Sequence, residues 1–196
     1  MAKITNSKDL LMWLLYAKGD EGRQCQPIRG RTRLMKMVFL FKKEIRRKFN
    51  MGKVISKDAL PDFEAYDFGP FSAQLFTDLE FLVELGFVHV KSAEGVDLLP
   101  EESLEYKYWK AGSESESDLG GPEYEEDFSL TSLGKEFVKD GKVGKLSKDQ
   151  EVVLNEFKAR CTAASLRSLL RYVYTNYPKT ITESKIRDEI LSEKPS

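Results

Sequence analysis

Residues 75–90 read LFTDLEFLVELGFVHV, and residues 128–137 read FSLTSLGKEF. In the first stretch, Leu75, Leu79 and Leu82 recur at spacings of four and three, which predicts a helix with one buried face. Gly86 is suited to end this helix, because glycine readily adopts the left-handed conformation found at helix C-termini. We predict that a strand at 87–91 pairs with a second strand at 128–130, and that a helix follows the second strand.

The clearest helix in the sequence covers residues 32–48, with Thr32 as its expected N-terminal cap. Its apolar positions recur at spacings of four, three, four and four, which predicts a buried face. The residues at these positions are Leu34, Val38, Phe41, Ile45 and Phe49. Lys36, Lys43 and Arg47 are seven and four residues apart, so we expect them to stack away from that face. We call these three residues the basic stripe.

The order of the predicted elements indicates the fold. Helices at 8–18, 32–48 and 71–85 precede a strand, a long insertion, a strand and a helix, and Pro70 is expected in the first turn of the third helix. This is the order of a winged-helix domain with an enlarged wing, so we predict a mainly α fold with a small β-wing, in the α+β class. The expected units are a winged-helix-like domain at 1–145, with an acidic insertion at about 92–127, and a C-terminal helical extension at 146–196.

Several motifs are similar to known families. The phrase FSLTSLGKEF resembles the wing strand and following helix of PadR-like and MarR-like regulators. The ordered motifs RLMKMVFL at 33–40, YDFGPFS at 66–72, LTSLG at 130–134 and YVYTNYP at 172–178 resemble the uncharacterised prokaryotic YwgA-like proteins over residues 8–190. The first two are also similar to the Panacea domain of SocA-like antitoxins. The chain departs from this pattern at Met35, where glutamine is expected, and in its longer acidic wing. The resemblance implies a regulator or an antitoxin-like accessory factor.

Charge is strongly separated along the chain, although the net charge is only −1. Residues 23–57 carry twelve Lys or Arg and one acid, whereas residues 94–127 carry twelve acids and two lysines. A basic segment of this density is typical of phosphate contact, so duplex DNA is a candidate partner. The residues expected to contact it are Arg29, Arg31, Arg33, Lys36, Lys43 and Arg47.

Other interpretations of the charge separation stay open. The two segments can be solvated surfaces of opposite sign, the acidic segment can dock on a basic partner protein, or it can fold over the chain's own basic stripe. Asp78, Glu80 and Glu84 lie on the predicted 71–85 helix and would repel a polyanion, which argues against base reading by that helix.

Aromatic residues interrupt the acidic segment at Tyr106, Tyr108 and Trp109. Tyrosine and tryptophan are frequent in the energetic centres of protein interfaces, so these three residues are candidate anchors for a protein partner. The alternative is that they pack back onto the domain.

The sequence offers little for catalysis, so we predict a protein that is not an enzyme and holds no cofactor or metal. His89 is the single histidine, and no second ligand or nucleophile accompanies it. Cys25 lies in a basic loop, which can lower the pKa of a thiol, but no base is paired with it. Asp97, Glu105 and Lys107 match the carboxylate–lysine pattern of restriction-like nucleases, which leaves a metal-dependent nuclease as the least favoured alternative.

Neither a secretory leader nor a membrane span is expected, because no apolar run approaches the length that a bilayer requires. Cys25 and Cys161 are far apart and should remain reduced thiols. We therefore expect a cytoplasmic protein that works by binding. The leading hypothesis is a nucleic-acid-binding regulator or antitoxin-type factor, and the alternative is a protein–protein adaptor that does not touch nucleic acid.

Overall fold

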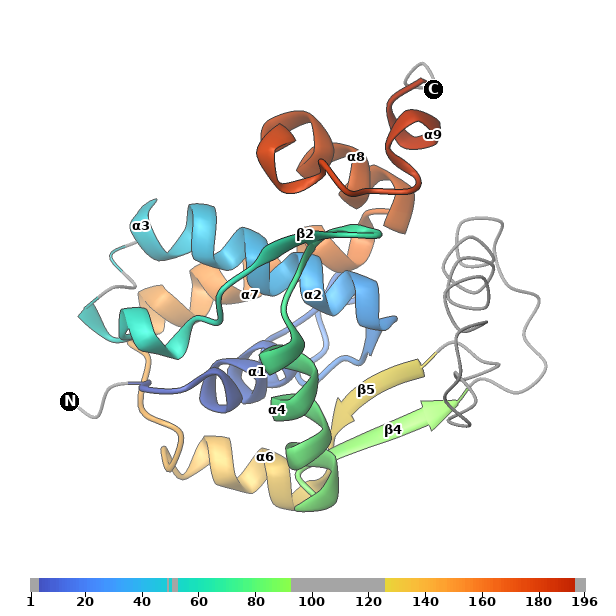
Figure 1. Ribbon diagram of the computed structural model, residues 1–196. Coiled ribbons are helices and arrows are strands. Elements are labelled where there is room, and N and C mark those ends of the chain that lie inside the picture. The colour runs from blue at the N-terminus through green and yellow to red at the C-terminus, as the bar shows by residue number, and fades with distance from the viewer. Residues whose placement is uncertain (1–3, 49, 51–52, 93–125, 193–196) are drawn as a thin grey trace.

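The computed structural model describes residues 4–48, 50, 53–92 and 126–192, which form a mainly helical molecule with small antiparallel sheets (Figure 1). The helices are α1 (Ser7–Tyr16), α2 (Arg31–Leu40), the π-helical turn η1 (Phe41–Ile45), α3 (Arg46–Lys48), the 3-10 turn η3 (Lys57–Ala59), α4 (Ala73–Glu84), α6 (Ser132–Lys139), α7 (Lys148–Ala163), α8 (Leu166–Asn176), the 3-10 turn η4 (Pro178–Thr180) and α9 (Arg187–Ser192). The strands are β1 (Ile28–Arg29), β2 (Glu64–Tyr66), β3 (Gly69–Phe71), β4 (Val88–Ser92) and β5 (Glu126–Leu130). The predicted α+β class is confirmed.

The larger sheet has the strand order β1-β5-β4, and both strand pairs are antiparallel. Val88 lies opposite Leu130, and Ile28 of β1 lies opposite Phe128. All four of these side chains are buried, so one face of the sheet belongs to the core. The predicted pairing of the strands near 87–91 and 128–130 is confirmed, and β1 is an additional edge strand that was not predicted.

Helix α2 is enclosed by other elements along most of its length. Every residue over 34–41 is buried, because α7, α8, β1 and β3 all contact this helix. Its N-cap is Gly30, with a φ of 84°, and the expected cap Thr32 instead lies buried in the first turn. The backbone turns into the helix at residue 30 with a positive φ, which glycine adopts without strain, so the helix begins before Thr32 can cap it.

A short hairpin, β2–β3, precedes α4. Pro70 lies in its second strand, opposite Ala65, and α4 begins only at Ala73 after the N-cap Ser72. The expected place of Pro70 in a first helical turn is therefore wrong: proline is tolerated in a two-stranded hairpin, where every strand is an edge. Gly69 has a φ of 82°, and a Cβ at this position would lie 2.9 Å from Cε1 of Tyr174.

The C-terminal helices cover one side of α2 (Figure 1). The buried residues of α7, α8 and α9 belong to the same apolar core as those of α1 and α2. Phe41 of η1 and Phe157 of α7 meet edge to face, with ring centroids 6.0 Å apart. Ser147 and Gln150 form a capping box that starts α7. In the described parts of the chain, no helix is both long and apolar enough to cross a bilayer.

Helix α6 starts tightly against the end of α4. Gly86 ends α4 with a φ of 72°, as the sequence predicts. The hydroxyl of Thr131, the N-cap of α6, accepts a hydrogen bond from Gly134 N at 3.1 Å and donates to Gly86 O at 2.7 Å. A Cβ at residue 134 would collide with the carbonyl oxygen of Phe87, so only glycine permits this close approach.

Candidate functional site

Lys36, the first residue of the basic stripe, is inside the molecule. Its side chain is only 2% exposed, and its ammonium donates to Pro70 O at 3.0 Å. The expectation that Lys36 faces solvent and contacts phosphates is therefore wrong. The physical reason is that β3 and α8 cover the side of α2 that a simple amphipathic helix would leave exposed.

Lys43 and Arg47, the other two residues of the stripe, are exposed, as predicted. Lys43 lies within the π-helical turn η1 and Arg47 follows it. This turn accommodates an extra residue and so rotates the side chains relative to an unbroken α-helix. The ammonium of Lys43 lies 5.6 Å from the ring centroid of Phe39. The structure thus separates the expected stripe into one internal cation and two surface cations.

Arg29 and Arg31 bind the last two acids of the acidic segment. Arg31 makes a two-pronged contact with the Glu126 carboxylate, and Arg29 Nε lies 3.4 Å from Asp127 Oδ1. Arg31 also lies over the ring of Phe76, with Cζ 5.4 Å from its centroid. Two acids of the acidic segment therefore neutralise two arginines of the basic segment within the chain.

Arg33 secures the C-terminal end of α7. Its Nη1 donates to Cys161 O and Ala164 O, both at 2.6 Å. The last carbonyls of a helix lack partners in the helix and carry its negative dipole end, so a guanidinium is well suited to this position. Arg33 therefore joins α2 to the α7–α8 connection, and its predicted role in phosphate contact stays a prediction.

A pocket of about 530 Å³ lies where these segments meet. Its described lining combines three arginines and three acids with small and hydroxyl-bearing side chains: Asp20, Glu21, Arg23, Gln26, Pro27, Arg29, Arg33, Asp127, Thr162, Ala163, Ala164 and Ser165. We call it the arginine pocket. It brings together Arg29 and Arg33 of the predicted set with α7 and α8.

The loop at 19–26 forms one wall of this pocket and is held at several points. Asp20 N donates to Thr162 Oγ1 at 3.1 Å, and the buried Gln26 donates to Asp20 Oδ1 at 2.7 Å while accepting from Glu21 N at 3.0 Å. The Thr162 hydroxyl is the main influence that lowers the pKa of Asp20, and the cation of Arg33 adds to it.

Lys158 lies beneath the same loop and is completely buried. Its ammonium donates to Leu15 O at 3.0 Å, Ala17 O at 2.9 Å and Gln26 O at 2.6 Å. Burial lowers its pKa from the ordinary value of 10.5 to about 7. Lys158 was not predicted as a functional residue, although its position four residues after Leu154 places it on the buried face of α7.

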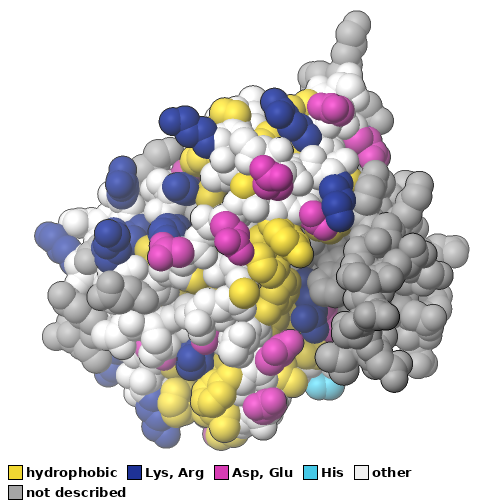
Figure 2. Space-filling view, viewed as in Figure 1, with side chains coloured by type: hydrophobic (Ala, Val, Ile, Leu, Met, Phe, Trp, Pro, Cys, Tyr) yellow, Lys and Arg dark blue, Asp and Glu magenta, His cyan; other side chains and the backbone are white. Residues whose placement is uncertain are grey.

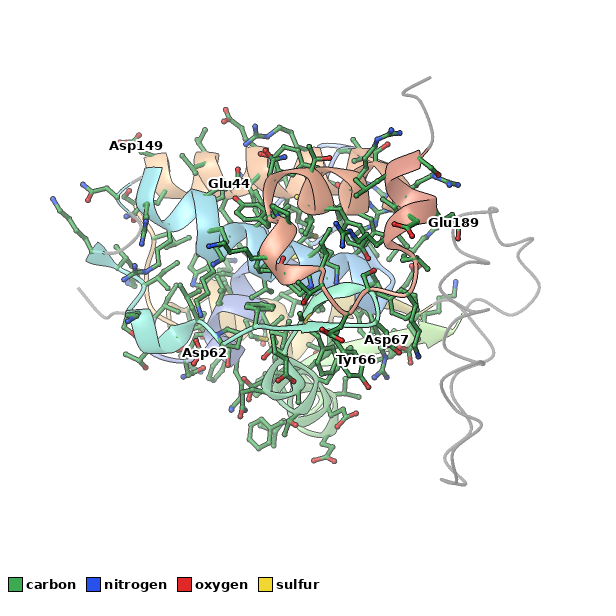
Figure 3. All side chains as sticks on the ribbon, turned by 45° about the horizontal axis from the view of Figure 1, so that its top comes forward. Glu44, Asp62, Tyr66, Asp67, Asp149 and Glu189 are labelled. Atoms are coloured by element: carbon green, nitrogen blue, oxygen red, sulfur yellow. The ribbon has the colours of Figure 1, made fainter. Side chains whose placement is uncertain are left out.

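Glu44 of η1 joins the central helix to α8 and the turn that follows (Figure 3). Its Oε1 accepts hydrogen bonds from Tyr172 at 3.0 Å and from Tyr177 at 2.8 Å. Burial and the Glu44 carboxylate both raise the pKa of Tyr177. Figure 3 also shows Tyr66 and Asp67 together on the β2–β3 hairpin, where Asp67 binds Lys185 at 2.7 Å.

The candidate catalytic residues do not come together in the described part of the chain. His89 is exposed on β4, opposite Ser129. Burial raises the pKa of the Cys25 thiol, and this effect outweighs the opposing influence of Lys135 and Lys158. Within the described ranges, no group of three or more His, Cys, Asp or Glu is placed to hold a metal ion. The nuclease-like set Asp97, Glu105 and Lys107 lies outside the described residues, as do the predicted partner anchors Tyr106, Tyr108 and Trp109.

Apolar side chains are exposed where α4 meets α6. Phe81 is 44% exposed, Leu85 49% and Leu133 52%. Phe81 and Leu85 are one helical turn apart on α4, as are Leu133 and the half-buried Phe137 on α6, and the Thr131–Gly86 hydrogen bond joins the two pairs. We call these four residues the α4–α6 apolar surface. In Figure 2, hydrophobic side chains gather at the lower end of the molecule, where Figure 1 places these helices.

Comparison with protein-family models, curated proteins and solved structures finds no significant match to this chain.

Proposed function

We propose that this protein acts by binding a partner protein, as a regulator or antitoxin-like accessory factor, rather than by catalysis. The resemblance of its motifs to YwgA-like proteins, and more distantly to the Panacea domain, supports this class of function. The order α4, β4, β5, α6, with β4 and β5 paired, supports a winged-helix-like core.

The observation that carries the proposal is the α4–α6 apolar surface. Single exposed apolar residues are ordinary, but Phe81 and Leu85 near the end of α4 and Leu133 at the start of α6 are all exposed, and the Thr131–Gly86 hydrogen bond brings these two helix ends together. In a winged-helix arrangement α4 is the helix that would face DNA. Its exposed residues include Glu80 and Glu84 beside Phe81 and Leu85, which suit a protein surface better than a row of phosphates.

The state of the cations supports the same proposal. Lys36 is internal, and Arg31 and Arg33 are engaged in contacts within the chain. Phosphate binding needs cations that are available to replace counterions, and these contacts already occupy a large part of the predicted DNA surface.

A photo-crosslinking amino acid at position 85 tests the proposal in the native host. Val152, which is 52% exposed on α7, provides the matched control position. A discrete adduct with another protein from position 85, but not from position 152, is the expected result. Equal labelling from both positions would contradict the proposal, and an adduct with a second copy of the chain would assign the surface to self-association instead.

Duplex DNA is a second candidate partner, because Lys43 and Arg47 are exposed as predicted. If they contact phosphates, affinity should fall with salt with a log–log slope of roughly −0.9 per neutralised phosphate. Reversing Lys43 and Arg47 to Glu should flatten this slope without unfolding the protein. Fluorescence anisotropy with a random duplex measures the affinity and its salt dependence for the wild type and for the variant. The absence of binding at about 50 mM salt, where phosphate contacts are strong, would remove this candidate.

A further inference from the structure

We propose that the arginine pocket binds a sugar phosphate, that is, a phosphate monoester on a chain of hydroxyl-bearing carbons. This inference is independent of the partner protein proposed above. It rests on the charge, the hydroxyl-binding groups and the shape of the pocket.

Two of the arginines can exchange their present partners for a phosphate. The side chains of Arg23 and Arg29 are 70% and 53% exposed, and the acids that pair with them at the pocket include Glu21 and Asp127 respectively. Exposed ion pairs are weak because water screens them, so they hold the guanidinium groups near the pocket without fixing them there. A phosphate dianion accepts two-pronged bonds from a guanidinium and is a stronger partner than a single carboxylate.

The remaining positive charge of the pocket is fixed by the fold. Arg33 is held in the wall by its bonds to Cys161 O and Ala164 O, so its charge is positioned before any ligand arrives. The pocket wall at Ser165 is also the N-cap of α8, whose dipole favours an anion.

The other polar groups of the pocket suit hydroxyls. The carboxylates of Asp20 and Glu21 can accept hydrogen bonds from a sugar. The hydroxyls of Thr162 and Ser165 donate to Lys158 O and Ser168 Oγ, and each oxygen can accept a further hydrogen bond from a ligand. A simple phosphate site would not need acids in its wall, because they repel the anion. Acids beside arginines are expected where one ligand carries both a phosphate and hydroxyl groups.

The lining also distinguishes a sugar from a nucleobase. Among the described residues that line the pocket there is no aromatic side chain. Nucleobases are commonly held by stacking on aromatic rings or guanidinium planes. A volume of about 530 Å³ is within the range of small-ligand sites. The described walls therefore favour a compact polar ligand over an extended nucleotide.

The loop is built to keep this shape. A Cβ at Gly19 would collide with Gln26, so the loop closes over the buried Gln26 amide, which binds Asp20 and Glu21 at once. Preorganisation of this kind reduces the ordering cost of binding.

Titration of the full chain with ribose 5-phosphate, followed by ¹⁵N–¹H NMR, tests the proposal. We expect saturable shifts of the Thr162 and Ser165 amides with a Kd below about 1 mM, tighter than for ribose or inorganic phosphate. No shift at about 10 mM ligand, or equal affinity for inorganic phosphate, would overturn it. AMP binding more than about tenfold tighter than ribose 5-phosphate would show base recognition and overturn the sugar assignment.

Variants locate the site. Replacing Arg23 and Arg29 together by Ala should weaken binding at least about tenfold, whereas the matched pair Lys43→Ala with Arg47→Ala should leave it unchanged. Asp127→Asn removes a carboxylate that competes with the ligand for Arg29 and should tighten binding several-fold, a gain that a damaged fold cannot produce. Unchanged affinity in both the double-alanine variant and Asp127→Asn would place the ligand elsewhere and overturn the proposal.

Discussion

Lys36 and Lys43 are chemically identical and seven residues apart, yet the structure gives them opposite environments. Lys36→Glu would place an unpaired negative charge against Pro70 O inside the core, and we expect it to cost at least about 3 kcal/mol of unfolding free energy. Lys43→Glu, its matched control, should change stability by no more than about 0.5 kcal/mol. Urea unfolding followed by circular dichroism measures both, and equal losses would contradict the assigned burial.

Lys158 makes stability depend on pH in a particular direction. The pKa is about 7 in the folded protein and near 10.5 once the chain unfolds. Between these values the unfolded chain binds a proton that the folded protein has released, so the free energy of unfolding should rise as pH increases through this window. The buried ammonium is charged below the window and is most costly to the fold there. The expected gain is on the order of a few kcal/mol.

Unfolding in urea at about pH 6.5 and about pH 9.5 tests this direction. Lys158→Met should lack the rise, whereas Lys148→Met, a change at an exposed position of the same helix, should keep it. Lys158→Met also leaves three carbonyls without their donor, which lowers the stability at both pH values. Comparing the change in unfolding free energy between the two pH values, rather than the free energy itself, cancels this cost. The same pH slope in the wild type and Lys158→Met would contradict the prediction.

At the level of single residues, the sequence predicted exposure well only where one helix alone decides it. Lys43 and Arg47 lie near the end of their helical segment and are exposed, whereas Lys36 and Arg33 are held by carbonyls from residues 34 or more positions away. From the sequence, a lysine in a helix is predicted to be exposed to solvent, because the element that covers it is not known. Lys158 was missed for the same reason, because its three acceptors lie more than 130 residues upstream.

At the level of elements, Glu44 links η1 to α8 through two phenols. Glu44→Ala removes the shared acceptor of Tyr172 and Tyr177 and should cost about 1–3 kcal/mol, since bonds to charged groups are the stronger ones. Glu44→Gln keeps an oxygen acceptor and should cost clearly less. Thermal unfolding compares the two variants. A loss as large for Gln as for Ala would show that the negative charge, rather than the acceptor, holds the two segments together.

The predictable elements were those with a strong local signal. The helices at 32–48 and 71–85 and the pair β4–β5 follow from apolar spacing, glycine at a helix end and alternation. Strands β1, β2 and β3 are two or three residues long, so they exist only through their partners. Pro70 illustrates this: its local sequence fits a helix start, and only its pairing with Ala65 makes it a strand residue.

At the level of the whole molecule, the C-terminal helices complete the core around α2. We expect a chain cut after residue 145 to lose cooperative unfolding, because it would expose the face of Phe41 that packs on Phe157 together with the buried side of α2. Circular dichroism and the dispersion of the NMR spectrum report this. A cooperatively folded 1–145 fragment would show instead that the extension at 146–196 is dispensable for folding.

The arginine pocket could not be predicted from the sequence, since its walls come from a loop near residue 20, β5 and the α7–α8 connection. The basic composition of residues 23–33 was visible, but the acids beside each arginine were not. Those acids change the expected ligand from a polyanion to a small molecule with both phosphate and hydroxyl groups.

Gly134 is confined by the carbonyl oxygen of Phe87, and Gly69 by the ring of Tyr174. Most surface positions of this chain can drift over evolutionary time, but a descendant that keeps α6 against the end of α4 cannot replace Gly134 by any other residue. The two glycines should therefore remain conserved among relatives whose overall sequence identity is low. A search that weights them above the rest of the chain would recognise distant members of this lineage whose remaining residues have diverged beyond ordinary detection.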